Sequence, residues 1–160
     1  MSPSESKTQT AAERREAEAE LRALVARYAP EQARLFGAVR RWLQKRLPTA
    51  HELVYEYRDN FVISYAPDDR GYEGVLALRA SADGIKLYLT AGKGLADPEK
   101  LLRGSGTQAR WLAVESASVL ARPAVAGLID AAIARQSAAF AASGRGPVVI
   151  RSTAAKKRRQ

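Results

Sequence analysis

The chain has 160 residues, enough for one domain with a buried core and terminal extensions. It contains no cysteine, which excludes a disulfide scaffold, a thiolate metal site and a cysteine nucleophile. Its N-terminus is charged and no apolar run reaches about 18 residues, so we expect neither a signal peptide nor a membrane span, and a cytoplasmic location.

The net charge of +9 is unevenly distributed. Residues 1–29 are neutral in sum and residues 30–143 are mildly basic, whereas residues 144–160 hold six basic and no acidic side chains. Such a basic C-terminal tail attracts nucleic acid through counterion release. The residues that would carry this nucleic-acid association are Arg151, Lys156, Lys157, Arg158 and Arg159. The simpler interpretation is a solvated tail that keeps the protein soluble.

Two helices are expected before the first strand. Residues 1–10 are rich in Ser, Thr and Lys and are predicted to be disordered, and residues 11–28 favour a helix that buries only its second half. Pro30 interrupts this helix and suits the first turn of another, which ends at Leu47-Pro48. The apolar stripe of the second helix consists of Leu35, Phe36, Val39, Trp42, Leu43 and Leu47.

Residues 52–91 read as a meander of four antiparallel strands. The segments 53–57 and 61–65 are rich in β-branched and aromatic residues, and Asp59-Asn60, residues 67–71 and Asp83-Gly84 are turn signals. Along the last strand Ile85, Leu87 and Leu89 alternate with Lys86, Tyr88 and Thr90. This alternation predicts one sheet face on the core and one in solvent.

The remaining elements follow the meander. A short helix is expected from Asp97-Pro98-Glu99 to the Gly104-Ser105-Gly106 stop, a fifth strand over 111–114, and a last helix that begins at Pro123 and ends at 143–147. Residues 148–150 read either as an extra edge strand or as part of the tail. The predicted fold is α+β: one domain over residues 11–143, with an antiparallel or mixed sheet of about five strands covered on one face by N- and C-terminal helices.

The connection from Gly92 to Arg110 combines four glycines with basic residues. Glycines let backbone N–H groups approach an anion, so this loop is a candidate phosphate or carboxylate site. It matches neither the P-loop motif GxxxxGK[ST] nor the dinucleotide-binding motif GxGxxG. Glycines at turns and basic residues on the surface are the simpler interpretation of this segment. The leading hypothesis places a ligand between this loop and the open sheet face. The predicted ligand-binding residues are Lys86, Tyr88, Lys93, Arg103 and Arg110.

Five tyrosines, Tyr55, Tyr57, Tyr65, Tyr72 and Tyr88, occur in or between the strands. On an open sheet face such aromatic side chains stack a base or line a pocket, and packing is the simpler interpretation.

No catalytic or metal signature is present. His51 is the only histidine; a zincin motif needs a second one four residues on, where Tyr55 stands, so we expect a surface histidine at a strand entry. Oxygen ligands for a hard cation or iron are offered by Glu52, Glu56, Asp68, Asp69 and Glu73. Surface ion pairs are the simpler interpretation of these carboxylates, and we predict no catalytic residue, metal or cofactor.

Residues 29–134 resemble the domain of unknown function 1801 family, also called YdhG-like. The resemblance rests on Tyr55-Glu56-Tyr57, on the strands 61–65 and 85–89, and on the pattern of glycines, leucines and Asp97-Pro98-Glu99 between Gly92 and Arg110. It extends to Pro123, Val125, Leu128, Ile129 and Ala132, and residues 144–152 look like the ending of one branch of the family.

The resemblance implies an α+β domain with helices packed on a mixed or antiparallel sheet. Some family members with a frataxin-like architecture are described as iron chaperones, a role that calls for an acidic ridge, whereas residues 30–143 are mildly basic. The sequence therefore favours a non-enzymatic binding module for a small anionic ligand or a protein partner. Nucleic-acid association through the tail, and iron delivery through Glu52, Glu56 and Asp68-Asp69, are the alternatives.

Overall fold

A mixed six-stranded sheet organises the computed structural model, which describes residues 8–70, 74–136 and 139–152. The strand order is β5-β4-β3-β2-β1-β6. The strands are β1 (His51–Glu56), β2 (Asn60–Ala66), β3 (Leu76–Ser81), β4 (Gly84–Leu89), β5 (Arg110–Val114) and β6 (Val148–Ser152). All neighbours pair antiparallel except β1 and β6, which are parallel. The predicted α+β class is confirmed.

The register places apolar side chains in rows across the sheet. Val54, Ile63, Leu78, Leu87 and Leu112 are aligned on five strands and are each at most 4% exposed. Because side chains alternate along a strand, Lys86 and Tyr88 lie on the opposite, partly exposed face. The alternation read from residues 85–89 is confirmed.

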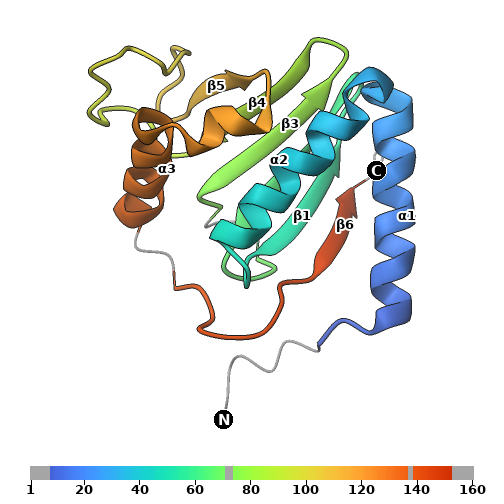
Figure 1. Cartoon of the computed structure of the whole chain (residues 1–160). Helices are drawn as coiled ribbons and strands as arrows, with labels where there is room; N and C mark the ends of the chain where they lie inside the picture. Colours follow the sequence, from blue (N-terminus) through green and yellow to red (C-terminus); the bar gives the residue numbers. More distant parts are fainter. Residues whose placement is uncertain (1–7, 71–73, 137–138, 153–160) are drawn as a thin grey trace.

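The helices cover one face of this sheet (Figure 1). They are α1 (Ala11–Tyr28), the 3-10 turn η1 (Pro30–Gln32), α2 (Ala33–Arg46), the 3-10 turn η2 (Ala117–Ala121) and α3 (Pro123–Gln136). Thr10 caps α1 through a reciprocal capping box with Glu13. From α2, Phe36 packs edge-on against Phe61 of β2 at 5.3 Å between ring centroids. None of the described helices is long and apolar enough to span a membrane.

The segment after residue 143 belongs partly to the sheet. Val148–Ser152 form edge strand β6, so the edge-strand interpretation is confirmed and the folded part extends beyond the predicted domain end. Pro147 accepts a bond from the backbone N–H of Glu52 at 2.9 Å, and the Gln9 side chain bonds both backbone groups of Val148. The first half of α1 lies over β6 and buries Ala17, although the sequence pattern assigned burial only to the second half.

The helix expected at Asp97 is absent, and that prediction is wrong. The Asp97 carboxylate accepts bonds from the backbone N–H groups of Leu101 and Leu102 at 2.9 and 2.8 Å, which closes a single turn. Lys100 has a φ of 54°, a left-handed conformation that ends the turn before a helix can propagate. Asp97 and Pro98, which predicted the start of a helix, therefore form a single capped turn.

Candidate anion-binding cleft

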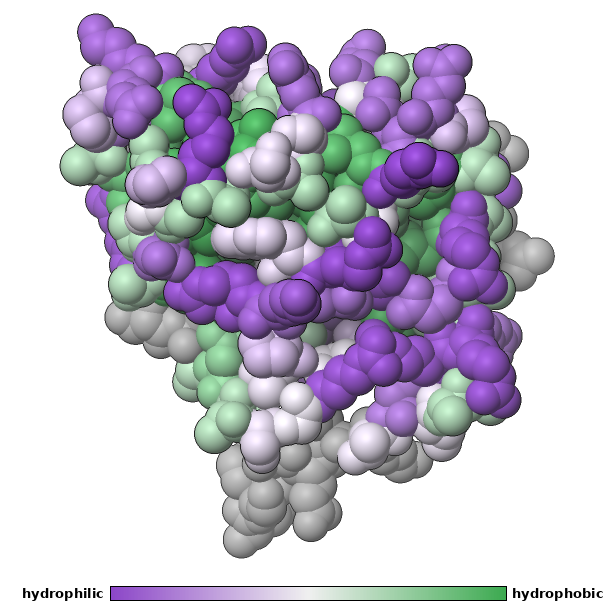
Figure 2. All heavy atoms as spheres, in the orientation of Figure 1, coloured by the Kyte–Doolittle hydropathy of each residue, from purple (hydrophilic) through white to green (hydrophobic). Residues whose placement is uncertain are grey.

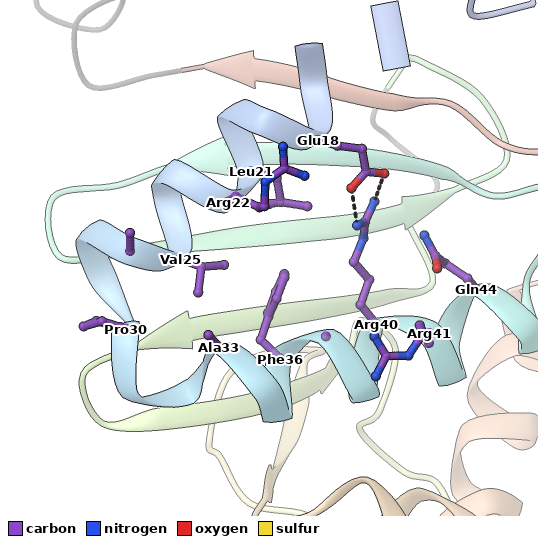
Figure 3. A pocket seen from close by; sticks show the side chains of 12 residues that line it. Glu18, Leu21, Arg22, Val25, Pro30, Ala33, Phe36, Arg40, Arg41 and Gln44 are labelled. Carbon is purple, nitrogen blue, oxygen red and sulfur yellow. Dashed lines mark hydrogen bonds and ion pairs between the residues drawn. The ribbon is translucent and has the colours of Figure 1, made fainter. Parts of the chain in front are cut away.

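A groove separates α1 from α2. The two helices meet at η1 and diverge toward the other end, where the segment leading into β6 passes (Figure 1). The groove encloses about 570 Å³, and Figure 3 shows side chains of both helices pointing into it. On the helix-covered side, apolar surface lies recessed between hydrophilic side chains (Figure 2).

The open end of the groove continues into a basic hollow of about 780 Å³. Its arginines are Arg14, Arg15, Arg22, Arg40, Arg41 and Arg145, and Glu18 is its one acidic side chain. Each helix presents one stripe of polar side chains to the hollow, because side chains four residues apart lie on the same face of a helix. The stripe on α1 consists of residues 14, 18 and 22, and the stripe on α2 of residues 40 and 44. The two helices and the segment before β6 thus bring arginines from three parts of the chain together.

Arg40 is the structural centre of the cleft. Its guanidinium donates two hydrogen bonds to the Glu18 carboxylate, at 2.6 and 2.9 Å, and two to Glu52, both at 2.9 Å. The bonds to Glu18 are drawn in Figure 3. Burial opposes the charged form, but the bonds to the two carboxylates outweigh it and raise the pKa of Arg40. The hydrogen bond from Arg40 likewise lowers the pKa of Glu18.

Glu52 forms the floor beneath Arg40. Its side chain is 3% exposed and also accepts bonds from Gln44 Nε2 at 2.9 Å and from the Tyr65 hydroxyl at 2.8 Å. Burial, together with the adjacent Glu52 charge, raises the pKa of Tyr65 well above its ordinary value, so Tyr65 stays a hydrogen-bond donor. With four bonds the carboxylate is saturated, and the floor acts as a fixed support for Arg40.

Arg14 and Arg145 both line the basic hollow. Arg14 donates a hydrogen bond to the Gly146 carbonyl at 3.0 Å, and its ion pair with Glu18 is long, at 3.7 Å. Burial, and then repulsion from Arg145, lower the pKa of Arg14, although a guanidinium stays charged at neutral pH. Two guanidiniums are thus held close enough to repel each other.

Among the described residues, four arginines of the cleft have no side-chain partner. Arg15, Arg22, Arg41 and Arg145 make no hydrogen bond or ion pair with any residue that the structure describes. Two carboxylates, Glu18 and Glu52, are already bound by Arg40. The cleft therefore carries several excess positive charges on a concave surface, which is the arrangement that attracts an anion.

Three of the predicted binding residues gather around Trp111 on the open face. The Lys86 ammonium lies 4.2 Å and the Arg103 guanidinium 5.8 Å from the Trp111 ring centroid, and the Tyr88 ring is 6.3 Å away. Arg103 and Trp111 also exchange two backbone hydrogen bonds, of 2.7 and 2.9 Å. The two cations cover the indole by cation–π contact, so this cluster fastens the 92–109 loop to the sheet.

Lys93 and Arg110 take other positions. The backbone of Lys93 bonds Gln108 and Arg135, and its side chain is exposed. The Arg110 guanidinium donates to the carbonyls of Gly106 and Ala109 at 2.6 and 2.7 Å, which ties up the loop itself. None of the five predicted binding residues lines the basic hollow or the groove.

Two of the five acidic residues considered for iron, Glu52 and Glu56, are buried, so the surface-pair interpretation is wrong for these two. Glu52 faces the helices, as does Glu56, which accepts bonds from Arg27 at 2.7 Å and from Tyr28. Asp68 pairs with Arg70 at 2.7 Å, and Glu73 lies outside the described residues, as does Tyr72. Within the described ranges no group of three His, Cys, Asp or Glu residues is arranged to hold a metal.

His51 is not a surface histidine, and that expectation is wrong. It is 9% exposed, and its Nδ1 atom is buried without a hydrogen-bond partner among the residues that the structure describes. Burial lowers the pKa of His51, against the weaker opposing charges of Asp69 and Asp68. The strand alternation could not reveal this, because His51 starts β1 and other segments cover it.

The neutral state of His51 predicts acid-sensitive stability. In the unfolded chain the His51 imidazole is protonated below its ordinary pKa of about 6.5, whereas in the folded protein its pKa is lower. The stability that the folded protein has above about pH 6.5 is therefore lost as the pH falls from that value toward the pKa of the folded protein. The urea concentration at the unfolding midpoint of the wild type should decrease as the pH is lowered from about 7.5 to about 5.5. In His51→Leu the midpoint should depend less on pH over this range. An equal fall in both proteins would show that His51 does not titrate on unfolding.

The basic tail is described only at its start. Arg151, in β6, donates a hydrogen bond to the Asp69 carbonyl at 2.6 Å and so joins the sheet edge to the β2–β3 connection. Lys156, Lys157, Arg158 and Arg159 lie outside the described residues. The nucleic-acid hypothesis stays a prediction, to be tested by the salt dependence of binding with and without residues 144–160.

Sequence reasoning missed the cleft arginines. The four-residue spacing of 14, 18 and 22 and of 40 and 44 was visible, but the pairing of α1 with α2 and the return of Arg145 were not. No protein-family model, curated protein or solved structure matches this chain. The resemblance to the domain of unknown function 1801 family therefore remains a prediction.

Proposed function

We propose that this protein is a binding module for a small anionic ligand and that the ligand occupies the arginine-lined cleft between α1 and α2. The observation that carries the proposal is a set of four arginines that have no partner among the described residues, Arg15, Arg22, Arg41 and Arg145, around a hollow of about 780 Å³. Guanidinium groups bind phosphate and carboxylate bidentately, and a concave low-dielectric wall strengthens that attraction.

The cleft supports binding more directly than proton transfer. Arginine stays protonated at neutral pH and has only donors, and Gln44 is already bound to Glu52. The Arg40–Glu52 network fixes the floor, so the four exposed arginines on the rim are the groups that would contact an anion. A ligand would also relieve the repulsion between Arg14 and Arg145, because it places negative charge between them.

Calorimetric titration with inorganic pyrophosphate tests this function. We expect binding that weakens with added salt, and about a tenfold or greater loss of affinity in Arg41→Ala and in Arg145→Ala, because each removes a hydrogen-bond donor to a charged ligand. Both side chains are exposed and have no partner among the described residues, so the fold should tolerate the changes.

Arg34→Ala is the matched control, since it removes one exposed arginine of α2 that does not line the cleft. It should bind pyrophosphate like the wild type, apart from the small effect of net charge. Equal losses in all three variants would indicate nonspecific attraction, and the absence of binding by the wild type would overturn the proposed function.

A further inference from the structure

We propose that the anion bound in the cleft carries a single apolar chain, which lies in the groove between α1 and α2. This inference rests on the proposed function and names the class of ligand: a soluble alkyl phosphate rather than a bare inorganic ion.

The groove is apolar along its inner part. Its floor is formed by Leu21, Val25 and Phe36, which are 2%, 7% and 4% exposed (Figure 3). Its rim is formed by the small exposed residues Ala26 and Ala33 and by Pro30. A volume of about 570 Å³ falls within the range of about 300–1,000 Å³ typical of small-molecule sites. Small rim residues leave the floor accessible to a narrow chain.

The apolar groove and the basic hollow form one continuous depression. Five residues line both, namely Glu18, Arg22, Arg40, Arg41 and Gln44. The groove begins near Pro30, where the helices meet, and the hollow ends at Arg14 and Arg145, where they have diverged. A ligand that spans both regions needs an apolar end and an anionic end.

Charge and shape select the class of this ligand. Four guanidiniums that have no partner within the described part of the chain match the charge of a phosphate monoester better than a neutral polar head group. The floor is recessed between two helices, so it is reached by one extended chain and not by the flat surface of a membrane. A free amphiphile is therefore the occupant that fits.

A chain-length series tests the inference. Methyl, butyl, hexyl and octyl phosphate are titrated calorimetrically below their micelle-forming concentrations, at one ionic strength. Burial of one methylene contributes about 0.8 kcal/mol, so affinity should rise about fourfold for each methylene that the groove covers. Methyl phosphate reports on the head group alone and thus on the proposed function.

Two substitutions locate the chain. Ala33→Trp and Ala26→Leu fill the groove from exposed rim positions of different helices and leave every arginine in place. Either variant should abolish the increase with chain length and retain the affinity for methyl phosphate. Arg41→Ala should weaken all four ligands by the same factor, because it acts on the head group.

The outcomes separate the two proposals. Methyl phosphate binding with no gain from longer chains would overturn the groove inference and leave the anion site intact. A gain with chain length that survives both filling variants would place the chain elsewhere and also overturn the inference. No binding of any member, including methyl phosphate, would remove the proposed function itself. Stronger binding to phosphatidic acid vesicles than to octyl phosphate would contradict a free amphiphile as the occupant.

Discussion

Arg40→Ala is expected to lower the free energy of unfolding by about 3–5 kcal/mol, the usual cost of removing one partner of a buried ion pair. The Arg40 side chain is 12% exposed and makes four hydrogen bonds to two carboxylates. Its loss leaves Glu52, 3% exposed, with a charge balanced only by the neutral donors Gln44 and Tyr65. Urea unfolding followed by circular dichroism measures the change.

The charge explanation can be separated from lost packing by a second substitution. In the Arg40→Ala background, Glu52→Gln removes the uncompensated charge and should recover part of the lost stability. Arg34→Ala, at an exposed position of the same helix, should stay within about 0.5 kcal/mol of the wild type. A loss of under 1 kcal/mol in Arg40→Ala would contradict the role assigned to the buried network.

Gly146→Ala should have the second largest effect, at or above about 3 kcal/mol, the upper part of the usual cost of overpacking. A Cβ atom at this position would lie 1.7 Å from the Ala50 carbonyl oxygen and 2.9 Å from the carbonyl carbon of Thr49. These are backbone atoms and cannot rotate away. The clash would displace the segment that carries Arg145 and leads into β6, so hydrogen exchange at Val148 and Ile150 should accelerate.

Gly127→Ala provides the control for this substitution. Gly127 lies on α3 with nothing within 4 Å of the added Cβ atom. Alanine there should stabilise the protein by roughly 0.5–1 kcal/mol, because glycine is a poor helix former. If Gly146→Ala retains wild-type stability and pyrophosphate affinity, the close contact with Ala50 does not position Arg145.

Local patterns in the sequence were sufficient to predict most of the fold. The alternation of Ile85, Leu87 and Leu89 identified a strand and its buried face, and residues 11–28 matched α1 at both ends. These features depend on neighbours in sequence, where periodicity is informative. Val148–Ile150 stayed ambiguous because a parallel edge strand depends on a partner, β1, almost 100 residues earlier.

The candidate site depends on contacts that a sequence pattern does not contain. Glu52 and Glu56 read as surface charges, yet Arg40 and Arg27, from two different helices, pair with them on the buried side of β1. Arg145 reaches Arg14 only because β6 returns beside β1. Tertiary packing determines which distant residues form ion pairs, and residue spacing does not contain this information. The sequence pattern therefore predicted the site at the 92–110 loop, where glycines and basic residues are close in sequence.

The central claim, that arginines of the α1–α2 cleft bind an anion, is tested most directly by NMR of the arginine side-chain Nε–H groups during a pyrophosphate titration. Resonances of Arg14, Arg41 and Arg145 should shift together and saturate at one dissociation constant. Arg103 and Arg151, held against Trp111 and the Asp69 carbonyl, should not move. Shifts confined to Arg103 and its neighbours on the open sheet face, with the cleft arginines unchanged, would contradict the claim.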